Sequence, residues 1–258
     1  MNRFFFSKEK LIHGIILIEG EDVQHISKVL RLSEGDKIIL CDGENFEYIS
    51  EIKTVEKTFI KSQVLEKKEC DSEPSVEITL FQGIPKGDKM DLIIQKSVEM
   101  GVHRIVPVIM KRSIVKIENE KDGKKKQERW QRIAMEAAKQ SGRGRIPHIL
   151  APLSFLEALK ISEKNDLRIL PYEKEEALSI KKSIKGFING LKEKTDETVF
   201  NSSVAILVGP EGGFEAKEVE KAILSGFAPV TLGKRILRTE TAGFVTLASL
   251  MYEFNEME

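Results

Sequence analysis

The chain has 258 residues, with 41 Lys and Arg, 41 Asp and Glu, and 41% hydrophobic residues. This length and apolar content suit one large or two modest folded domains and exclude an intrinsically disordered chain. A formal net charge of zero excludes a uniformly basic nucleic-acid-binding protein, so any basic surface has to be local.

Cysteines and histidines are few, and no apolar run is long. Cys41 and Cys70 are too few to form a zinc site by themselves or to staple a secreted fold. The four histidines lie far apart and lack a Cys or carboxylate at metal-ligand spacing, so we expect no metal. Apolar runs fall well short of the ~20 residues that span a bilayer. We therefore expect a cytoplasmic protein that makes no membrane contact.

The first ~70 residues combine short alternating runs with turn residues, a pattern typical of a small β-rich domain. Asp42-Gly43 predicts a hairpin turn after a strand at residues 37–41. One helix is expected over residues 23–32, with Asp22 as its N-cap. The stretch Asp-Ser-Glu-Pro at residues 71–74 breaks this pattern. We place a domain boundary there, which gives domains at residues 1–71 and 72–258.

Beyond the boundary, apolar strand candidates alternate with amphipathic helical patterns, which predicts an α/β fold with a mostly parallel sheet covered on both faces. Ser154 and Glu157 predict a capping box, and Thr239 or Thr241 is expected to cap the last helix. The charged segment 173–203 is expected to hold a helix and a surface loop. Strands are expected at residues 76–81, 102–110, 167–170, 204–208 and 229–232.

A glycine-rich turn, GPEGGF, follows the strand candidate at residues 204–208. Open α/β sheets bind ligands at the carboxyl ends of such strands, because backbone N–H groups are exposed there. The turn matches neither the dinucleotide fingerprint nor the P-loop, which disfavours phosphate binding. Its proline and Glu211 indicate a fixed loop with one carboxylate, suited to a polar or cationic ligand. A tight turn that only begins the next helix would have the same residues, so the pattern leaves both readings open.

Two basic segments are candidates for anion binding. The stretch LGKRILRTETA at residues 232–242 places two arginines and a lysine before a helix, where they could orient an anion or only be solvated. Residues 111–145 contain 12 Lys and Arg against 5 Asp and Glu, a local excess typical of a nucleic-acid footprint. Within it, Arg143 and Arg145 stand on a glycine-rich backbone that could reach RNA. The lysines of residues 121–126 are better explained as a solvated surface.

Together these segments resemble a known family. Five segments resemble the ribosomal small-subunit methyltransferase E family, in the same order along nearly the whole chain. They are the N-terminal Arg3-Phe4-Phe5, residues 25–32, QSGRGRIP (140–147), VAILVGPEGGF (204–214) and LGKRILRTETA (232–242). The resemblance implies a SPOUT-class methyltransferase domain with a C-terminal trefoil knot, an N-terminal PUA-like β-barrel and a homodimer. It also implies S-adenosyl-L-methionine as cofactor and methylation of N3 of a specific uridine in 16S ribosomal RNA of the small ribosomal subunit.

The resemblance also implies roles for residues of this chain. Arg238 and Glu211 are the catalytic candidates. The implied cofactor-binding residues are Leu170, Pro171, Leu207, Gly209, Gly212, Gly213, Leu232, Gly233, Ile236, Leu237, Thr239 and Ala242. The implied RNA-binding residues are Arg3, His25, Lys28, Arg31, Arg143 and Arg145.

Three other functions are weighed against this one. The chain could be a non-catalytic RNA-binding ribosome-assembly factor that keeps the fold but has lost the cofactor, although its intact glycine loops argue against this. It could be a SPOUT methyltransferase acting on another nucleotide or on a ribose hydroxyl. The alternation of strands and helices would also suit an oxidoreductase with a nucleotide cofactor, but the fingerprint and the acidic residue ~20 residues further on are missing.

Overall fold

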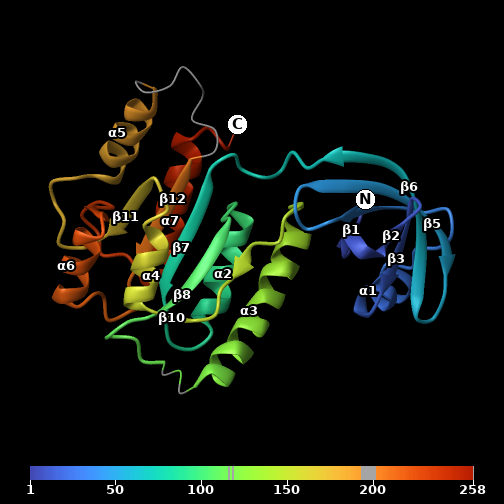
Figure 1. Ribbon diagram of the computed structural model, residues 1–258, viewed down its shortest axis with the longest axis horizontal. Helices are drawn as coiled ribbons and strands as arrows, with labels where there is room; N and C mark the ends of the chain where they lie inside the picture. Colours follow the sequence, from blue (N-terminus) through green and yellow to red (C-terminus); the bar gives the residue numbers. More distant parts are fainter. Residues whose placement is uncertain (116, 118, 193–201, 258) are drawn as a thin grey trace. The chain divides into compact units, whose positions relative to one another are not determined.

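The computed structural model describes residues 1–115, 117, 119–192 and 202–257. They form two compact units (Figure 1). Unit 1 comprises Met1–Glu73 and Ala138–Ile146, and unit 2 comprises Pro74–Ala137 and Pro147–Glu258. The predicted domains, 1–71 and 72–258, have a single boundary. The structure adds the segment Ala138–Ile146 to the first unit, although it lies far along the chain.

Unit 1 is built on a six-stranded sheet with the order β1-β4-β5-β6-β3-β2. Strand β1 runs parallel to β4, and the other pairs are antiparallel. Alternate residues point inward and bury a core rich in isoleucine, which confirms the expected β-rich unit. The strands are β1 (Arg3–Phe5), β2 (Leu11–Ile12), β3 (Ile15–Glu19), β4 (Lys37–Cys41), β5 (Phe46–Val55) and β6 (Phe59–Glu69).

The hairpin predicted at Asp42-Gly43 is confirmed between β4 and β5. The Asp42 carboxylate accepts hydrogen bonds from the backbone N–H groups of Glu44, Asn45 and Phe46 at 3.0, 3.1 and 3.0 Å. Burial opposes ionisation, but these hydrogen bonds hold the pKa of Asp42 below its ordinary value. Gly43 has a φ of +77°, which a residue with a side chain rarely adopts.

The continuous helix expected over residues 23–32 is wrong. The chain forms a short helix α1 (Glu21–Gln24) and then a π-helical turn η2 (His25–Val29). Gly20, with a φ of +79°, occupies the N-cap position. Asp22 makes no cap because it already lies inside α1, and its carboxylate accepts a hydrogen bond from Lys139 Nζ at 2.9 Å. The sequence around residue 22 gives no sign of this partner, which is 117 residues away.

Unit 2 is built on a seven-stranded parallel sheet with the order β10-β8-β7-β12-β11-β13, in which β9 also pairs with β8. The predicted α/β fold with a parallel sheet is confirmed. The strands are β7 (Glu77–Gly83), β8 (Arg104–Ile109), β9 (His148–Ile149), β10 (Leu153–Ser154), β11 (Leu167–Pro171), β12 (Ser203–Val208) and β13 (Ala228–Val230).

Helices cover both faces of this sheet. Helices α4 and α6 pack over the face that carries Leu207, whereas α7 lies against Val208, the next residue, whose side chain points to the opposite face. The helices are α2 (Lys89–Glu99), α3 (Glu120–Gln140), α4 (Phe155–Ser162), α5 (Ile180–Lys192), α6 (Ala216–Leu224) and α7 (Thr239–Glu253).

The helix starts test several predictions. The capping box of α4 is confirmed, since the Glu157 N–H donates to Ser154 Oγ at 3.4 Å and the Ser154 N–H donates to Glu157 Oε2 at 2.9 Å. The threonine cap expected for α7 is wrong, because Arg238 occupies the N-cap position and Thr239 is already helical. Of the helix and loop expected at 173–203, α5 is the helix, and residues 193–201 lie outside the described residues.

The described residues contain neither a membrane-spanning helix nor a metal-binding cluster. None of their helices is both long enough and apolar enough to cross a membrane. The same residues contain no group of three or more His, Cys, Asp or Glu side chains arranged to hold a metal ion.

Candidate active site

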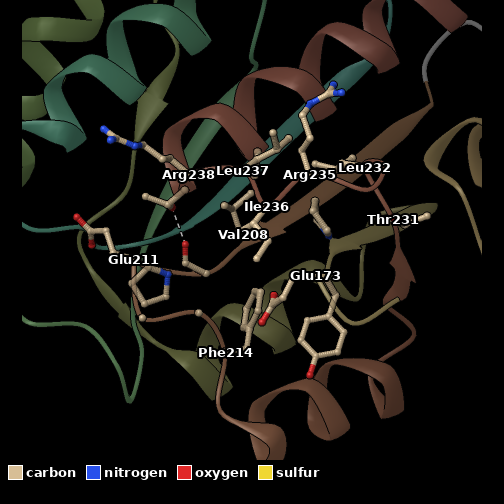
Figure 2. A pocket seen from close by; sticks show the side chains of 18 of the residues that line it. Glu173, Val208, Glu211, Phe214, Thr231, Leu232, Arg235, Ile236, Leu237 and Arg238 are labelled. Carbon is tan, nitrogen blue, oxygen red and sulfur yellow. Dashed lines mark hydrogen bonds between the residues drawn. The ribbon is translucent and has the colours of Figure 1, made fainter. Parts of the chain in front are cut away.

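Neighbouring strands of the parallel sheet end at one edge, and the loops that follow them line one cavity (Figure 2). The lining comes from the loops after β11, β12 and β13, from the first turn of α7 and from the approach to α2. The cavity volume is about 580 Å³, within the ~300–1,000 Å³ range of small-molecule sites. Its position is where open α/β sheets bind ligands.

Close packing gives the glycine-rich turn its shape. Gly213 has a φ of +68°, and its N–H donates to the Pro210 carbonyl at 2.9 Å. Gly83, the last residue of β7, lies directly against Pro210, so that a Cβ on Gly83 would be 2.7 Å from both the Pro210 nitrogen and Cδ. Sequence reasoning missed Gly83. Its signal was a glycine just after the strand predicted at residues 76–81.

A chain of hydrogen bonds joins three segments at the cavity. Thr239 Oγ1 donates to the Gly209 carbonyl at 2.6 Å and accepts from Gln82 Nε2 at 2.9 Å. These residues belong to α7, the turn after β12, and β7. Thr239 and Gln82 are both buried, so breaking either bond would leave polar groups without partners. The bonds hold the start of α7 against the glycine-rich turn.

Lys89 makes a second connection between the same segments. Its Nζ lies 3.2 Å from Glu211 Oε1 and 3.5 Å from Glu240 Oε2. The Lys86 N–H also donates to both Glu211 carboxylate oxygens at 3.3 Å. Although burial opposes ionisation, these hydrogen bonds and the Lys89 charge hold the pKa of Glu211 below its ordinary value. Glu211 is therefore a carboxylate at neutral pH, and its oxygens anchor the turn.

The mouth of the cavity carries several positive charges. Lys234, Arg235 and Arg238 line it, and their side chains form no hydrogen bond or ion pair with any described residue. Figure 2 shows the guanidinium groups of Arg235 and Arg238 pointing outward from the cavity. Such cations suit an anionic partner such as a nucleic-acid backbone.

Comparison with known proteins identifies the family. Residues 72–251 match a family model described as an RNA methyltransferase domain, and residues 18–65 match one described as an RNA methyltransferase PUA domain. The chain is 37% identical over 236 residues to the ribosomal RNA small subunit methyltransferase E of Bacillus subtilis (strain 168), covering 92% of this chain and 89% of that protein. The chain belongs to the ribosomal RNA small subunit methyltransferase E family.

Solved structures of similar proteins agree with this family. A ribosomal RNA small subunit methyltransferase E from Neisseria gonorrhoeae, bound to S-adenosyl methionine, is 32% identical, with a TM-score of 0.82 over 98% of each chain. A putative methyltransferase from Legionella pneumophila, in complex with the bound cofactor SAM, is 30% identical, with a TM-score of 0.82 over 97% of each chain.

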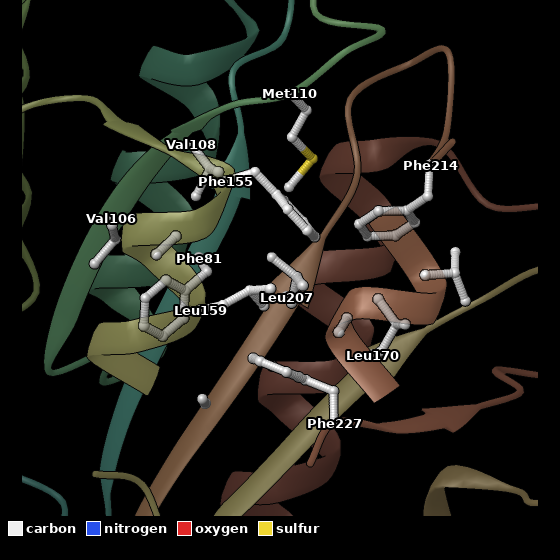
Figure 3. Close-up of a cluster of buried hydrophobic side chains, with 14 residues drawn as sticks. Phe81, Val106, Val108, Met110, Phe155, Leu159, Leu170, Leu207, Phe214 and Phe227 are labelled. Carbon is white, nitrogen blue, oxygen red and sulfur yellow. The ribbon is translucent and has the colours of Figure 1, made fainter. Parts of the chain in front are cut away.

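Most of the residues to which the family resemblance assigns a cofactor role lie together. Both catalytic candidates, Arg238 and Glu211, also line the cavity. Leu170 and Leu207 do not, because their side chains point to the opposite face of β11 and β12 and pack in the core with α4 and α6 (Figure 3). The candidates that line the cavity are Pro171, Gly209, Gly212, Gly213, Leu232, Gly233, Ile236, Leu237, Thr239 and Ala242.

Phe214 connects the cavity to that core. Its ring lines the cavity and also packs in the buried cluster of Figure 3. A Cβ on Gly209 would lie 3.1 Å from this ring, so the backbone at Gly209 packs closely against Phe214. Further lining residues to which the resemblance assigns no role are Lys86, Lys89, Tyr172, Glu173, Val208, Pro210, Phe214, Thr231, Lys234 and Arg235. Of these, Val208, Pro210, Phe214, Lys234 and Arg235 lie in the two motifs described above, whereas no motif marks the others in the sequence.

The RNA-binding candidates of unit 1 differ in exposure. His25, Lys28 and Arg31 are exposed, and the His25 ring stands edge-on to Phe4 at 6.0 Å between centroids. The Arg3 side chain is only 16% exposed and forms an ion pair with Glu47 at 2.7 Å. His25, Lys28 and Arg31 are therefore open to an RNA partner, whereas Arg3 is engaged within the unit.

The expectation that Arg143 contacts RNA does not fit its surroundings. Arg143 is 4% exposed, and its NH2 group lies 2.6 Å from Glu73 Oε2. Glu73 Oε1 also accepts hydrogen bonds from the backbone N–H groups of Gly144 and Arg145, each at 3.1 Å. Arg145 Nε donates to the Glu44 carbonyl at 2.9 Å. The buried Arg143 and these hydrogen bonds hold the segment Ala138–Ile146 in unit 1.

Proposed function

We propose that this chain is an S-adenosyl-L-methionine-dependent methyltransferase that methylates N3 of a uridine in 16S ribosomal RNA. The observation that carries the proposal is the cavity at the carboxyl ends of β11, β12 and β13, lined by the turn at residues 209–214 and the segment 231–239. The relatives and the similar structures described above support the same substrate and cofactor.

The residues of the cavity fit this cofactor. Gly233 has a φ of +102°, and a Cβ there would meet no atom within 4 Å, so its backbone is open to a ligand. Apolar side chains of Leu232, Leu237 and Phe214 suit a planar base, and we assign the backbone groups of Leu232 and Leu237 to its polar edge. The bound cofactor supplies a methyl carbon made electrophilic by a positively charged sulfur.

The side chains that line the cavity have to align the uracil and help its N3 to lose a proton. We assign Arg238 to orient the uracil or its phosphate, and its positive charge would favour the deprotonated imide. Glu211 is held as an ion by Lys89 and by the Lys86 N–H, which makes it a weak proton acceptor. Its role is to hold the turn and balance nearby positive charge.

We extend the proposal to the features that characterise the wider class. A SPOUT-type trefoil knot is supported by the return of the chain from β13 to the turn after β12, where Thr239 bonds to Gly209. A homodimer is supported by three exposed apolar side chains, which a second copy would bury. They are Val245 and Tyr252 of α7 and Met257 after it. Light scattering of the purified chain measures the dimer.

Because the proposed substrate is ribosomal RNA, we assign the chain to the cytoplasm.

The function is tested by methyl transfer in vitro. The purified chain, S-adenosylmethionine and either small ribosomal subunits or free 16S RNA are incubated, and digested RNA is analysed by mass spectrometry. We expect one 3-methyluridine per RNA. Arg238→Ala is expected to lower kcat by about a hundredfold through misalignment, without weakening cofactor binding. Absence of both cofactor binding and methyl transfer would favour the assembly factor, and a methyl group elsewhere would favour a related methyltransferase.

The RNA contacts of unit 1 are tested by salt dependence. Lys28→Ala and Arg31→Ala are each expected to weaken RNA binding and to reduce the log-log salt slope by about 0.7 to 0.9 per lost phosphate contact. Lys53→Ala is the control, since Lys53 is exposed in the same unit but pairs with Glu51. Filter binding over a range of salt concentrations measures the slopes. Slopes equal to that of the unmodified chain would remove both residues from the interface.

A further inference from the structure

A carboxylate lines the cavity opposite the basic groups of its mouth. Glu173 follows β11 and is one of the lining residues drawn in Figure 2. Its Oε1 lies 3.6 Å from the position that a Cβ on Gly213 would occupy, so the carboxylate rests against the glycine-rich turn. Glu173 is thus at the part of the cavity that the cofactor is proposed to occupy.

The charges around Glu173 are unevenly compensated. Two carboxylates line the cavity, and Glu211 is occupied by Lys89 and the Lys86 N–H. Glu173 forms no hydrogen bond or ion pair with any residue that the structure describes. The described lining residues therefore include an unpaired negative charge in the cavity itself, in addition to the unpaired cations at its mouth.

We propose that Glu173 makes the pocket prefer the positively charged methyl donor to its neutral thioether product. This inference rests on the proposed function. Donor and product share their adenosine and amino-acid parts, so contacts to those parts stabilise both complexes equally. They differ in the methyl group and in the sulfonium charge, and a carboxylate nearby stabilises only the charged form.

The basic residues at the mouth of the cavity explain why a carboxylate near the cofactor is useful. Lys234, Arg235 and Arg238 suit the RNA substrate, but their field disfavours a cationic cofactor and would by itself favour the neutral product. Glu173 offsets that field at the cofactor end of the cavity. The expected consequence for turnover is that the spent cofactor leaves more readily and inhibits less.

Isothermal titration calorimetry of the full chain tests the proposal, with S-adenosylmethionine and S-adenosylhomocysteine as the two ligands. Glu173→Gln keeps the size of the side chain and removes its charge. We expect it to weaken donor binding about three- to tenfold and to change product binding by about twofold or less. Glu176→Gln is the matched control, because Glu176 lies three residues further on and is exposed, as Glu173 is, but does not line the cavity.

A second measurement follows the same discrimination during turnover. The ratio of the product inhibition constant to the KM of the donor is expected to fall in Glu173→Gln and to recover in Glu173→Asp, which restores the charge. Equal weakening of both ligands, or no change in either, would overturn the proposal. Failure of the unmodified chain to bind either ligand would instead overturn the proposed function, so the two failures are distinguishable.

Discussion

Gly83→Ala is expected to weaken S-adenosylmethionine binding at least about tenfold while leaving the fold intact. An added Cβ would lie 2.7 Å from the Pro210 nitrogen and Cδ and 2.9 Å from Met110 Sδ. Because the nearest atoms include backbone, the turn after β12 has to shift, at a cost of about 1–3 kcal/mol. The shift displaces the backbone proposed to hold the cofactor. Calorimetric titration measures the loss.

Gly186→Ala is the control for this substitution. Gly186 lies inside helix α5, and a Cβ there would meet no atom within 4 Å. We expect unchanged cofactor affinity and slightly higher stability, since alanine favours a helix by about 1 kcal/mol over glycine. Circular dichroism of both variants checks that the fold is retained. Cofactor affinity in Gly83→Ala equal to that of the unmodified chain would show that the turn does not hold the cofactor.

Arg143→Ala is expected to destabilise unit 1 by about 3–5 kcal/mol, because it leaves the Glu73 carboxylate buried without its cation. The side chain of Glu73 is 8% exposed, so water replaces the lost partner poorly. The same change loosens the segment Ala138–Ile146, which Glu73 also holds through two backbone N–H groups. Urea denaturation followed by circular dichroism measures the change, with separate transitions fitted if the two units unfold independently.

Two further variants separate this structural role from an RNA contact. Replacing the pair together, Arg143→Met with Glu73→Leu, is expected to recover much of the stability, because no unpaired charge stays buried. Arg145→Ala is the single-site comparison and is expected to cost about 1 kcal/mol, since it removes mainly a side-chain bond to the Glu44 carbonyl. Full stability in Arg143→Ala together with a flatter salt slope for RNA binding would restore Arg143 to the RNA interface.

Features with short-range causes were predictable. The Asp42-Gly43 hairpin depends on hydrogen bonds that reach four residues at most, and the Ser154–Glu157 capping box spans three. The parallel sheet followed from apolar runs alternating with amphipathic helices. The turn at residues 209–214 and the segment 232–242 were candidates for a ligand site because both follow predicted strands, whose carboxyl ends could meet at one edge of the sheet.

Features with long-range causes were not predictable. Asp22 bonds to Lys139, 117 residues away, and Arg143 pairs in the interior with Glu73, 70 residues away. Gly83 looks like an ordinary glycine until Pro210 is placed against it. Lys89 reads as a helix residue until Glu211 and Glu240 are brought within 3.5 Å.

The sequence by itself determined the order of the elements, the α/β class of the larger unit and the two motifs that surround the cavity, because periodicity and turn chemistry act between near neighbours. Tertiary structure decided which charges are neutralised. Glu211 is paired with Lys89 and Arg143 with the buried Glu73, whereas the side chains of Glu173 and Arg238, which line the cavity, have no partner among the described residues. That difference sets the chemistry of the site, because a charge acts on a ligand only where the fold leaves it uncompensated.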